Sequence, residues 1–303
     1  PFIIAKKHKN IKILILKSLC LELYMLYLNH MENVVIKKRK KLNVKNLCLL
    51  IFFLVMLIIF LFSLIKVIMW IIDNNNTNDI IKKVANTYEI NEKSYDNEVI
   101  INENEKDIYF DYMKLKFIDV DINKLKTFNP DTIGFIKVMG TNINYPFVQT
   151  LDNDYYLNRS YDKTYNNAGW IFLDYRNNEF NDKNTIIYGH GRINGTMFGS
   201  LKDTLKSSWQ NNKDNYIIKI STEKENSIWQ IFSVYKIATT SDYLQTTFSD
   251  NEFESFINLI KGRSSYNFET NVTNEDKVLT LSTCYNDNDK MVVHAKLIKY
   301  VQK

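Results

Sequence analysis

The apolar residues of this chain form one long run and, much later, a series of short runs in which apolar and polar positions alternate. Residues 47–65 are apolar apart from Cys48 and Ser63, and residues 67–72 continue the run. Nineteen helical residues, at about 1.5 Å each, come close to the ~30 Å hydrocarbon core of a bilayer. A secretory signal has a shorter apolar core, and a buried helix of a soluble domain is rarely so uniformly apolar. The pattern therefore predicts a membrane-spanning helix.

Charged residues on either side of the apolar run predict its orientation. Five basic residues at 37–41 precede the run, whereas Asp73 and three asparagines follow it. Because basic flanks stay in the cytoplasm, the N-terminus is expected inside the cell and the C-terminal part outside. We therefore expect a single-pass protein of the cell membrane with an extracellular domain.

These patterns divide the chain into five segments. They are a leader (1–30), a basic cytoplasmic tail (31–45), the transmembrane helix (46–72), a polar extracellular stalk (73–107) and the outer domain (108–303). The leader begins with Pro1 and has no clear amphipathic period, whereas Met31 opens a more ordinary start. We expect the leader to be translated upstream sequence without function.

The outer domain alternates apolar and polar residues in short stretches rich in Ile, Val, Tyr and Phe, which is typical of β-strands. Eight strands are expected, at 133–139, 142–149, 168–175, 184–188, 215–221, 228–238, 277–283 and 291–300. Eight short strands with few helices favour a mainly β fold, either a closed barrel or a sandwich.

Helical spacing is found at three places in the outer domain. One or two short helices are expected over 108–128, one over 197–207 and one over 250–261. The last carries Phe253, Phe256, Ile257 and Ile260 on one face, and Ser249 or Asp250 could cap its start.

Composition excludes several classes of function. The chain has 303 residues and a net charge of only +5, without the aromatic and basic stripe of a nucleic-acid binder. It has no phosphate-binding glycine motif and no Cys or His at metal-ligand spacing. We therefore expect no cofactor, no metal and no nucleic-acid partner.

The outer domain contains a single cysteine, Cys284, which follows the apolar stretch 277–283. An unpaired cysteine in an exported domain is a liability unless the protein uses it, although a buried inert thiol is the alternative. His190 follows another predicted strand, 184–188, and is flanked by two glycines. A thiol and an imidazole at strand ends are the components of a nucleophile and its acid–base partner.

Acyl transfer also needs a donor for the oxyanion that forms during attack. Arginine is the usual choice, but no arginine follows Cys284. Lys290 is the only cation shortly after the cysteine. Taken alone, a single lysine is nearly always a solvated surface residue.

Several segments, taken in order, resemble a class B sortase from about residue 109 to the end. The segments are Ile133-Gly134-Phe135-Ile136, Tyr145-Pro146-Phe147-Val148-Gln149, Gly169-Trp170-Ile171-Phe172-Leu173-Asp174, Tyr188-Gly189-His190 with Met197-Phe198-Gly199, Thr280-Leu281-Ser282-Thr283-Cys284, and Val292-Val293-His294-Ala295-Lys296-Leu297. Each segment alone is a weak signal, whereas together they are specific.

The resemblance implies a closed eight-stranded β-barrel with N-terminal helices and one helix between the sixth and seventh strands. It implies a cysteine transpeptidase in which Cys284 cleaves an NPxT-like or PPxT-like sorting motif after its threonine, with His190 as acid and base. An exported surface protein would be the donor, and an amine of peptidoglycan or of its lipid-linked precursor the acceptor. Five residues are implied to bind the motif: Ser282, Thr283, Tyr243, Leu244 and Thr246. We expect a monomer.

One position departs from the family pattern. The family's catalytic arginine precedes the Val-Val-His strand, and Lys290 occupies that place here. A lysine holds an oxyanion as a point charge only, so we expect a working but weaker site. Arg192 or Arg176 could substitute for it.

Three alternatives to this function remain. A degenerate protein of the same fold would bind sorting peptides without turnover. A pilin-polymerising sortase usually carries a lid ahead of the barrel and a second membrane span after it, and because no second span is expected here we rank this function low. A papain-type peptidase is disfavoured because its cysteine precedes its histidine.

Overall fold

The computed structural model describes residues 21–28, 43–101 and 114–303, and the chain separates into two compact units, Pro1–Lys66 and Val67–Lys303. Residues 21–28 are helical, and a long helix, α2, runs over Val44–Ala85. Among the described residues α2 is the one helix long and apolar enough to cross a membrane, with a mean hydropathy of 3.3 in its most apolar window.

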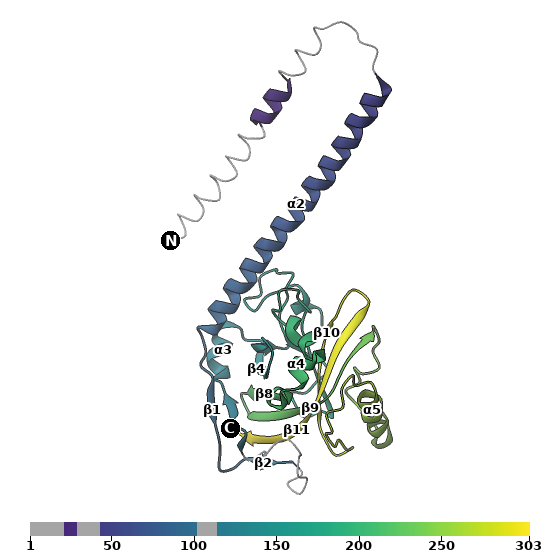
Figure 1. Ribbon diagram of the computed structural model, residues 1–303. Coiled ribbons are helices and arrows are strands. Elements are labelled where there is room, and N and C mark those ends of the chain that lie inside the picture. The colour runs from purple at the N-terminus through teal and green to yellow at the C-terminus, as the bar shows by residue number, and fades with distance from the viewer. Residues whose placement is uncertain (1–20, 29–42, 102–113) are drawn as a thin grey trace. The chain divides into compact units, whose positions relative to one another are not determined.

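The second unit is built around a closed β-barrel (Figure 1). Its strands are β4 (Thr132–Val138), β5 (Asn144–Val148), β6 (Phe172–Leu173), β7 (Asn184–Tyr188), β8 (Ile217–Thr222), β9 (Glu225–Ala238), β10 (Val278–Cys284) and β11 (Asp289–Gln302). They pair in the order β10-β7-β6-β5-β4-β8-β9-β11, and β10 pairs with β11 to close the ring. The predicted eight-stranded barrel is therefore confirmed.

One predicted strand is much shorter than expected. Only β6 forms within 168–175, because loop contacts hold the residues before it. Gly169 has a positive φ of 57°, and Trp170 N–H donates to the carbonyl of Tyr156 at 2.9 Å. The backbone at this point is therefore bound to the preceding loop and not to a neighbouring strand.

The helix α5 (Asp250–Gly262) lies between the sixth and seventh barrel strands, β9 and β10, as predicted. Ser249 and Glu252 form a capping box at its start. Its apolar face is buried, as expected: Phe253, Phe256, Ile257 and Ile260. Capping and amphipathic spacing together explain why this segment is helical.

Two predicted helices differ from the structure. The segment 197–207 contains a 3₁₀-helix, η3 (Gly199–Leu205), followed by a short helix, α4 (Ser207–Gln210). Of 108–128, residues 108–113 lie outside the described residues, and the rest contains β3 (Phe117–Asp119) and α3 (Ile122–Phe128). Phe117 and Ile118 are fully buried, which explains a strand in this position. Two further 3₁₀-helices are η2 (Tyr155–Leu157) and η4 (Lys213–Tyr216).

The described part of the expected stalk, residues 73–101, packs against the barrel. Its first residues belong to α2, and Ile80 and Val84 are buried in the main core. Further along, β1 (Asn91–Lys93) pairs with β3, and β2 (Val99–Ile100) pairs with β11. These residues therefore form part of the folded domain.

Candidate active site

Two neighbouring strands bring Cys284 and His190 to the same end of the barrel. β7 and β10 run parallel, and Ser282 of β10 is the register partner of Tyr188 of β7. Cys284 and His190 each follow two residues after those partners. A Cβ atom on Gly191 would lie 2.0 Å from the carbonyl oxygen of Cys284, so only glycine permits this approach of the two segments.

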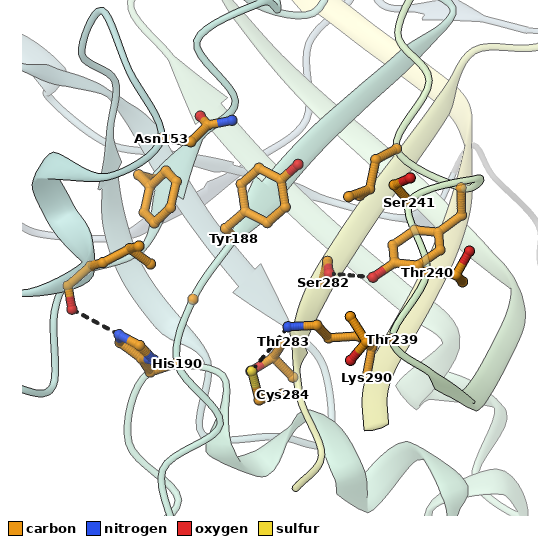
Figure 2. A pocket seen from close by; sticks show the side chains of 15 residues that line it. Asn153, Tyr188, His190, Thr239, Thr240, Ser241, Ser282, Thr283, Cys284 and Lys290 are labelled. Atoms are coloured by element: carbon orange, nitrogen blue, oxygen red, sulfur yellow. Dashed lines mark hydrogen bonds between the residues drawn. The ribbon is translucent and has the colours of Figure 1, made fainter. Parts of the chain in front are cut away.

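Both side chains line one pocket of about 570 Å³. Figure 2 shows them on neighbouring segments at the same end of the pocket. The Cys284 thiol is exposed, and His190 is half-buried. A peptide carbonyl could therefore reach the thiol from solvent, in the pocket that His190 also lines.

The imidazole of His190 is held by a backbone carbonyl. Its Nε2 lies 2.7 Å from the carbonyl oxygen of Leu157. A carbonyl oxygen can only accept, so Nε2 carries a proton and Nδ1 is the nitrogen left for proton exchange. This bond fixes both the tautomer and the ring orientation.

Lys290 lies beside the thiol. It is the register partner of Cys284 on the antiparallel neighbour β11, and its Nζ lies 3.2 Å from Sγ (Figure 2). Among the residues that line the pocket it is the one cation. A lysine ammonium at this distance can stabilise a thiolate, and later an oxyanion formed at the same place.

Neither predicted substitute for this cation lines the pocket. Arg176 makes two hydrogen bonds to the Asp174 carboxylate, at 2.9 and 2.7 Å, and Arg192 pairs with Asp73 at 2.9 Å. Each guanidinium therefore has a carboxylate partner outside the pocket.

Four of the five residues expected to bind substrate line the pocket: Ser282, Thr283, Tyr243 and Leu244. Thr246 does not. The Tyr243 hydroxyl lies 3.0 Å from Ser282 Oγ, and the buried hydroxyl of Thr283 has no hydrogen-bond partner within the described part of the chain.

The pocket wall formed by residues 239–244 is fixed from behind. Arg176 donates to the carbonyl of Leu244 at 2.9 Å, and Asn184 Nδ2 donates to the carbonyl of Gln245 at 2.8 Å. Burial works to raise the pKa of Asp174, but hydrogen bonds from Arg176 outweigh it and hold that pKa below its usual value. The anchoring pair thus stays ionised.

The second histidine of the predicted motifs, His294, does not line the pocket and is fully buried. Burial lowers its pKa to about 3, with a smaller contribution from Arg263. Its nitrogens bond Thr280 at 2.9 Å and Tyr235 at 2.8 Å. This histidine is neutral and structural at neutral pH.

Several residues of the pocket were not predicted from the sequence: Asn153, Leu157, Phe172, Thr239, Thr240 and Ser241. Leu157 acts through its carbonyl, which no side-chain pattern reveals. The others come from loops, or from the short strand β6, whose position depends on the closed barrel.

Comparison with known proteins agrees with this geometry. Residues 136–298 match the Sortase domain family. The chain is 37% identical over 188 residues to Sortase B of Listeria monocytogenes. This match covers 59% of this chain and 74% of that protein.

Solved structures give the same result. The chain resembles a Staphylococcus aureus sortase B–substrate complex with 38% identity and a TM-score of 0.55, over 59% of this chain and 84% of that one. It resembles sortase B from B. anthracis in complex with AAEK1 with 33% identity and a TM-score of 0.59, over 76% of this chain and 99% of that one. The chain therefore belongs to the sortase family of cysteine transpeptidases, and its similarity is to the sortase B class.

Proposed function

We propose that this protein is a membrane-anchored class B sortase that joins exported proteins to a cell-wall amine. Cys284 is the nucleophile, His190 the acid and base, and Lys290 the cation that stabilises negative charge. The observation that carries the proposal is the Nζ of Lys290 lying 3.2 Å from the Cys284 sulfur, on the pocket that His190 also lines.

In the first half-reaction Nδ1 of His190 takes the proton of the Cys284 thiol, and the resulting thiolate attacks the carbonyl carbon of the sorting motif's threonine. Negative charge moves to the carbonyl oxygen, where the Lys290 ammonium stabilises it. The C–N bond then breaks, and Nδ1 of His190 gives a proton to the departing amine. A thioester on Cys284 remains.

In the second half-reaction an amine attacks the thioester. His190 takes the proton that the amine loses, the new amide bond forms and the Cys284 sulfur leaves. We propose that the amine belongs to peptidoglycan or to its lipid-linked precursor. The Leu157 carbonyl keeps Nδ1 available in both steps because it occupies Nε2.

We propose that the motif is NPxT-like or PPxT-like and binds along Ser282, Thr283, Tyr243 and Leu244. These residues provide apolar surface and hydroxyl groups on the pocket wall. The similarity to a sortase B that has been solved with substrate supports a peptide in this place. A contribution from Thr246 would have to come from beyond the pocket.

The apolar part of α2 is proposed to anchor the protein, with the basic residues at 37–41 in the cytoplasm and residues 73–303 outside. Under this proposal residues 31–45 form the cytoplasmic tail, and residues 1–30 take no part in function.

A second candidate function is binding of sorting peptides without turnover. It is favoured by one observation, the lysine in place of the family's arginine. A lysine offers no planar fork for the oxyanion.

A peptide-cleavage screen separates the two functions. The full-length protein in detergent would be incubated with NPxT-like and PPxT-like peptides, with Cys284→Ala as the control. We expect cleavage after threonine and a thioester on Cys284 detectable by mass spectrometry. Peptide binding with neither cleavage nor thioester would favour the second function.

A further inference from the structure

Three polar residues of α2 contact the two loops that hold His190. They are Asp73, Asn74 and Thr77, and Asn74 and Thr77 are buried. Buried polar groups on a helix persist where their partners satisfy them. All the residues concerned belong to the unit Val67–Lys303.

The first contact is to the loop that carries His190. Arg192 donates to Asp73 Oδ2 at 2.9 Å and also to Asn74 Oδ1. The same Asn74 oxygen accepts a second bond, at 3.1 Å, from Asn194 Nδ2. The Arg192–Asp73 pair is largely shielded, with side chains 13% and 16% exposed.

That loop is closed tightly on His190 itself. The backbone N–H groups of Arg192 and Phe198 both donate to the His190 carbonyl, at 3.1 and 3.0 Å. A Cβ on Gly199 would lie 2.1 Å from the Arg192 carbonyl oxygen, so the turn has little freedom. A shift of the Arg192 side chain is therefore passed to the backbone of His190.

The second contact is to the loop that supplies the Leu157 carbonyl. Thr77 donates its hydroxyl proton to the Asp73 carbonyl at 2.8 Å, so it accepts from Asn166 Nδ2, 3.1 Å away. Asn166 N–H in turn donates to the carbonyl of Asn158, the residue after Leu157, at 3.0 Å.

The same loop also touches the imidazole ring. Asn166 accepts a bond from Gly169 N–H at 3.0 Å, and a Cβ on Gly169 would lie 3.0 Å from His190 Cδ2. One turn of α2 thus supports both the backbone of His190 and the group that orients its ring.

We propose that residues 73–77 of α2 position His190, with Arg192 as the positioning residue and not as the catalytic cation. This inference rests on the proposed role of His190 and deepens it, because the acid–base group is tied to the helix that continues into the apolar segment. A displacement of α2 then changes the orientation and tautomer of the imidazole.

Three variants of the full-length protein in lipid nanodiscs test this coupling. Arg192→Gln and Asn74→Ala each remove part of the contact, and the double variant Asp73→Arg/Arg192→Asp restores the ion pair between positions 73 and 192 with reversed charge. Lys224→Gln is the matched control, because it removes a cation from the exposed Lys224–Glu179 pair on another part of the barrel unit.

We expect kcat for peptide cleavage to fall about 10- to 100-fold in both single variants, as for a misplaced catalytic group, with KM nearly unchanged. In ¹⁵N spectra of the histidine side chains, His190 should lose its uniform Nε2–H tautomer. The double variant should recover both properties, and Lys224→Gln should match the wild type.

Other outcomes would overturn the inference. If Arg192→Gln abolishes cleavage while Asn74→Ala and the His190 tautomer are unaffected, Arg192 acts in the chemistry itself. If the single variants unfold more easily but keep the tautomer and kcat, the contact is only structural. The tautomer is measured without substrate, so it tests the inference even if the wild type cleaves no peptide.

Discussion

Lys290 is the residue whose identity most affects the expected rate. Its position opposite Cys284 follows from strand register, so any side chain there would point to the thiol. What lysine lacks is the second parallel donor of an arginine. The chemistry of the side chain, and not its placement, is therefore expected to limit the site.

Substitutions at Lys290 test this expectation. Lys290→Met should lower kcat/KM for peptide cleavage roughly ten- to hundredfold. This corresponds to about 1.5–3 kcal/mol in activation free energy, because one charged hydrogen bond is lost. Lys290→Arg should raise kcat above that of the wild type. Lys224→Met serves as a control for the loss of one positive charge. An unchanged rate in Lys290→Met would remove Lys290 from the mechanism.

The burial of His294 predicts how the free energy of unfolding depends on pH. Its folded-state pKa of about 3 lies below the ordinary 6.5, so the unfolded chain binds the extra proton between these values. The contribution of His294 to the free energy of unfolding is therefore fully present above about pH 6.5. It falls as the pH drops towards 3, and about 2 kcal/mol of it is lost at pH 5.

Chemical denaturation in detergent at pH 7 and pH 5 measures this loss. His294→Gln should remove about 2 kcal/mol of the difference between the two pH values, whatever its effect on total stability. Equal pH dependence in His294→Gln and wild type would contradict a neutral buried histidine.

At the scale of elements, the pocket wall formed by residues 239–244 depends on contacts that other strands and loops make with it or with the next residue. Arg176 reaches it from the segment after β6, and Asn184 reaches it from β7. The hydroxyl of Tyr188 also bonds Asp174, at 2.9 Å, and so supports the same anchor. The position of the pocket wall therefore depends on its hydrogen bonds to the barrel.

Arg176→Lys should weaken this wall without touching the chemistry. The exposed guanidinium loses one of its bonds, which we expect to cost about 1 kcal/mol, roughly fivefold in KM for the peptide. The kcat and the rate of Cys284 alkylation without peptide should stay near the wild-type values. A collapse of kcat would instead support Arg176 as a substitute catalytic cation.

Local patterns predicted most strands and α5, because alternation and capping depend on neighbours in sequence. They also indicated Cys284 and His190, which lie at the end of one apolar strand and just after another. The parallel pairing of β7 with β10 joins segments about ninety residues apart, and no local pattern contains it. For the same reason the Leu157 carbonyl and the absence of Thr246 from the pocket could not be foreseen.

The described part of the expected stalk also shows that local patterns do not contain contacts between distant segments. Asp73 and the asparagines after it are polar, which is typical of an exposed linker. Their partners Arg192, Asn194 and Asn166 lie far along the chain, so only the folded structure reveals that Asn74 and Thr77 are buried.

At the scale of the whole molecule, the cysteines offer a test of membrane topology. The chain has three, at positions 20, 48 and 284, and Cys48 lies within the apolar part of α2. Cys284 is exposed on the barrel unit. If the basic residues at 37–41 remain in the cytoplasm, Cys284 alone faces the outside of the cell.

Intact cells treated with a membrane-impermeant maleimide should therefore label the protein once, at Cys284. The variant Cys284→Ala should take no label until the cells are opened, whereas Cys48→Ala should label like the wild type. A sorting peptide added before the reagent should slow labelling, because it occupies the pocket beside the thiol.

Labelling of Cys284→Ala in intact cells would mean that a cysteine of the N-terminal part reaches the outside, which contradicts the proposed orientation. Labelling of the wild type only after lysis would place the pocket in the cytoplasm, where neither an exported protein nor a cell-wall amine could reach it.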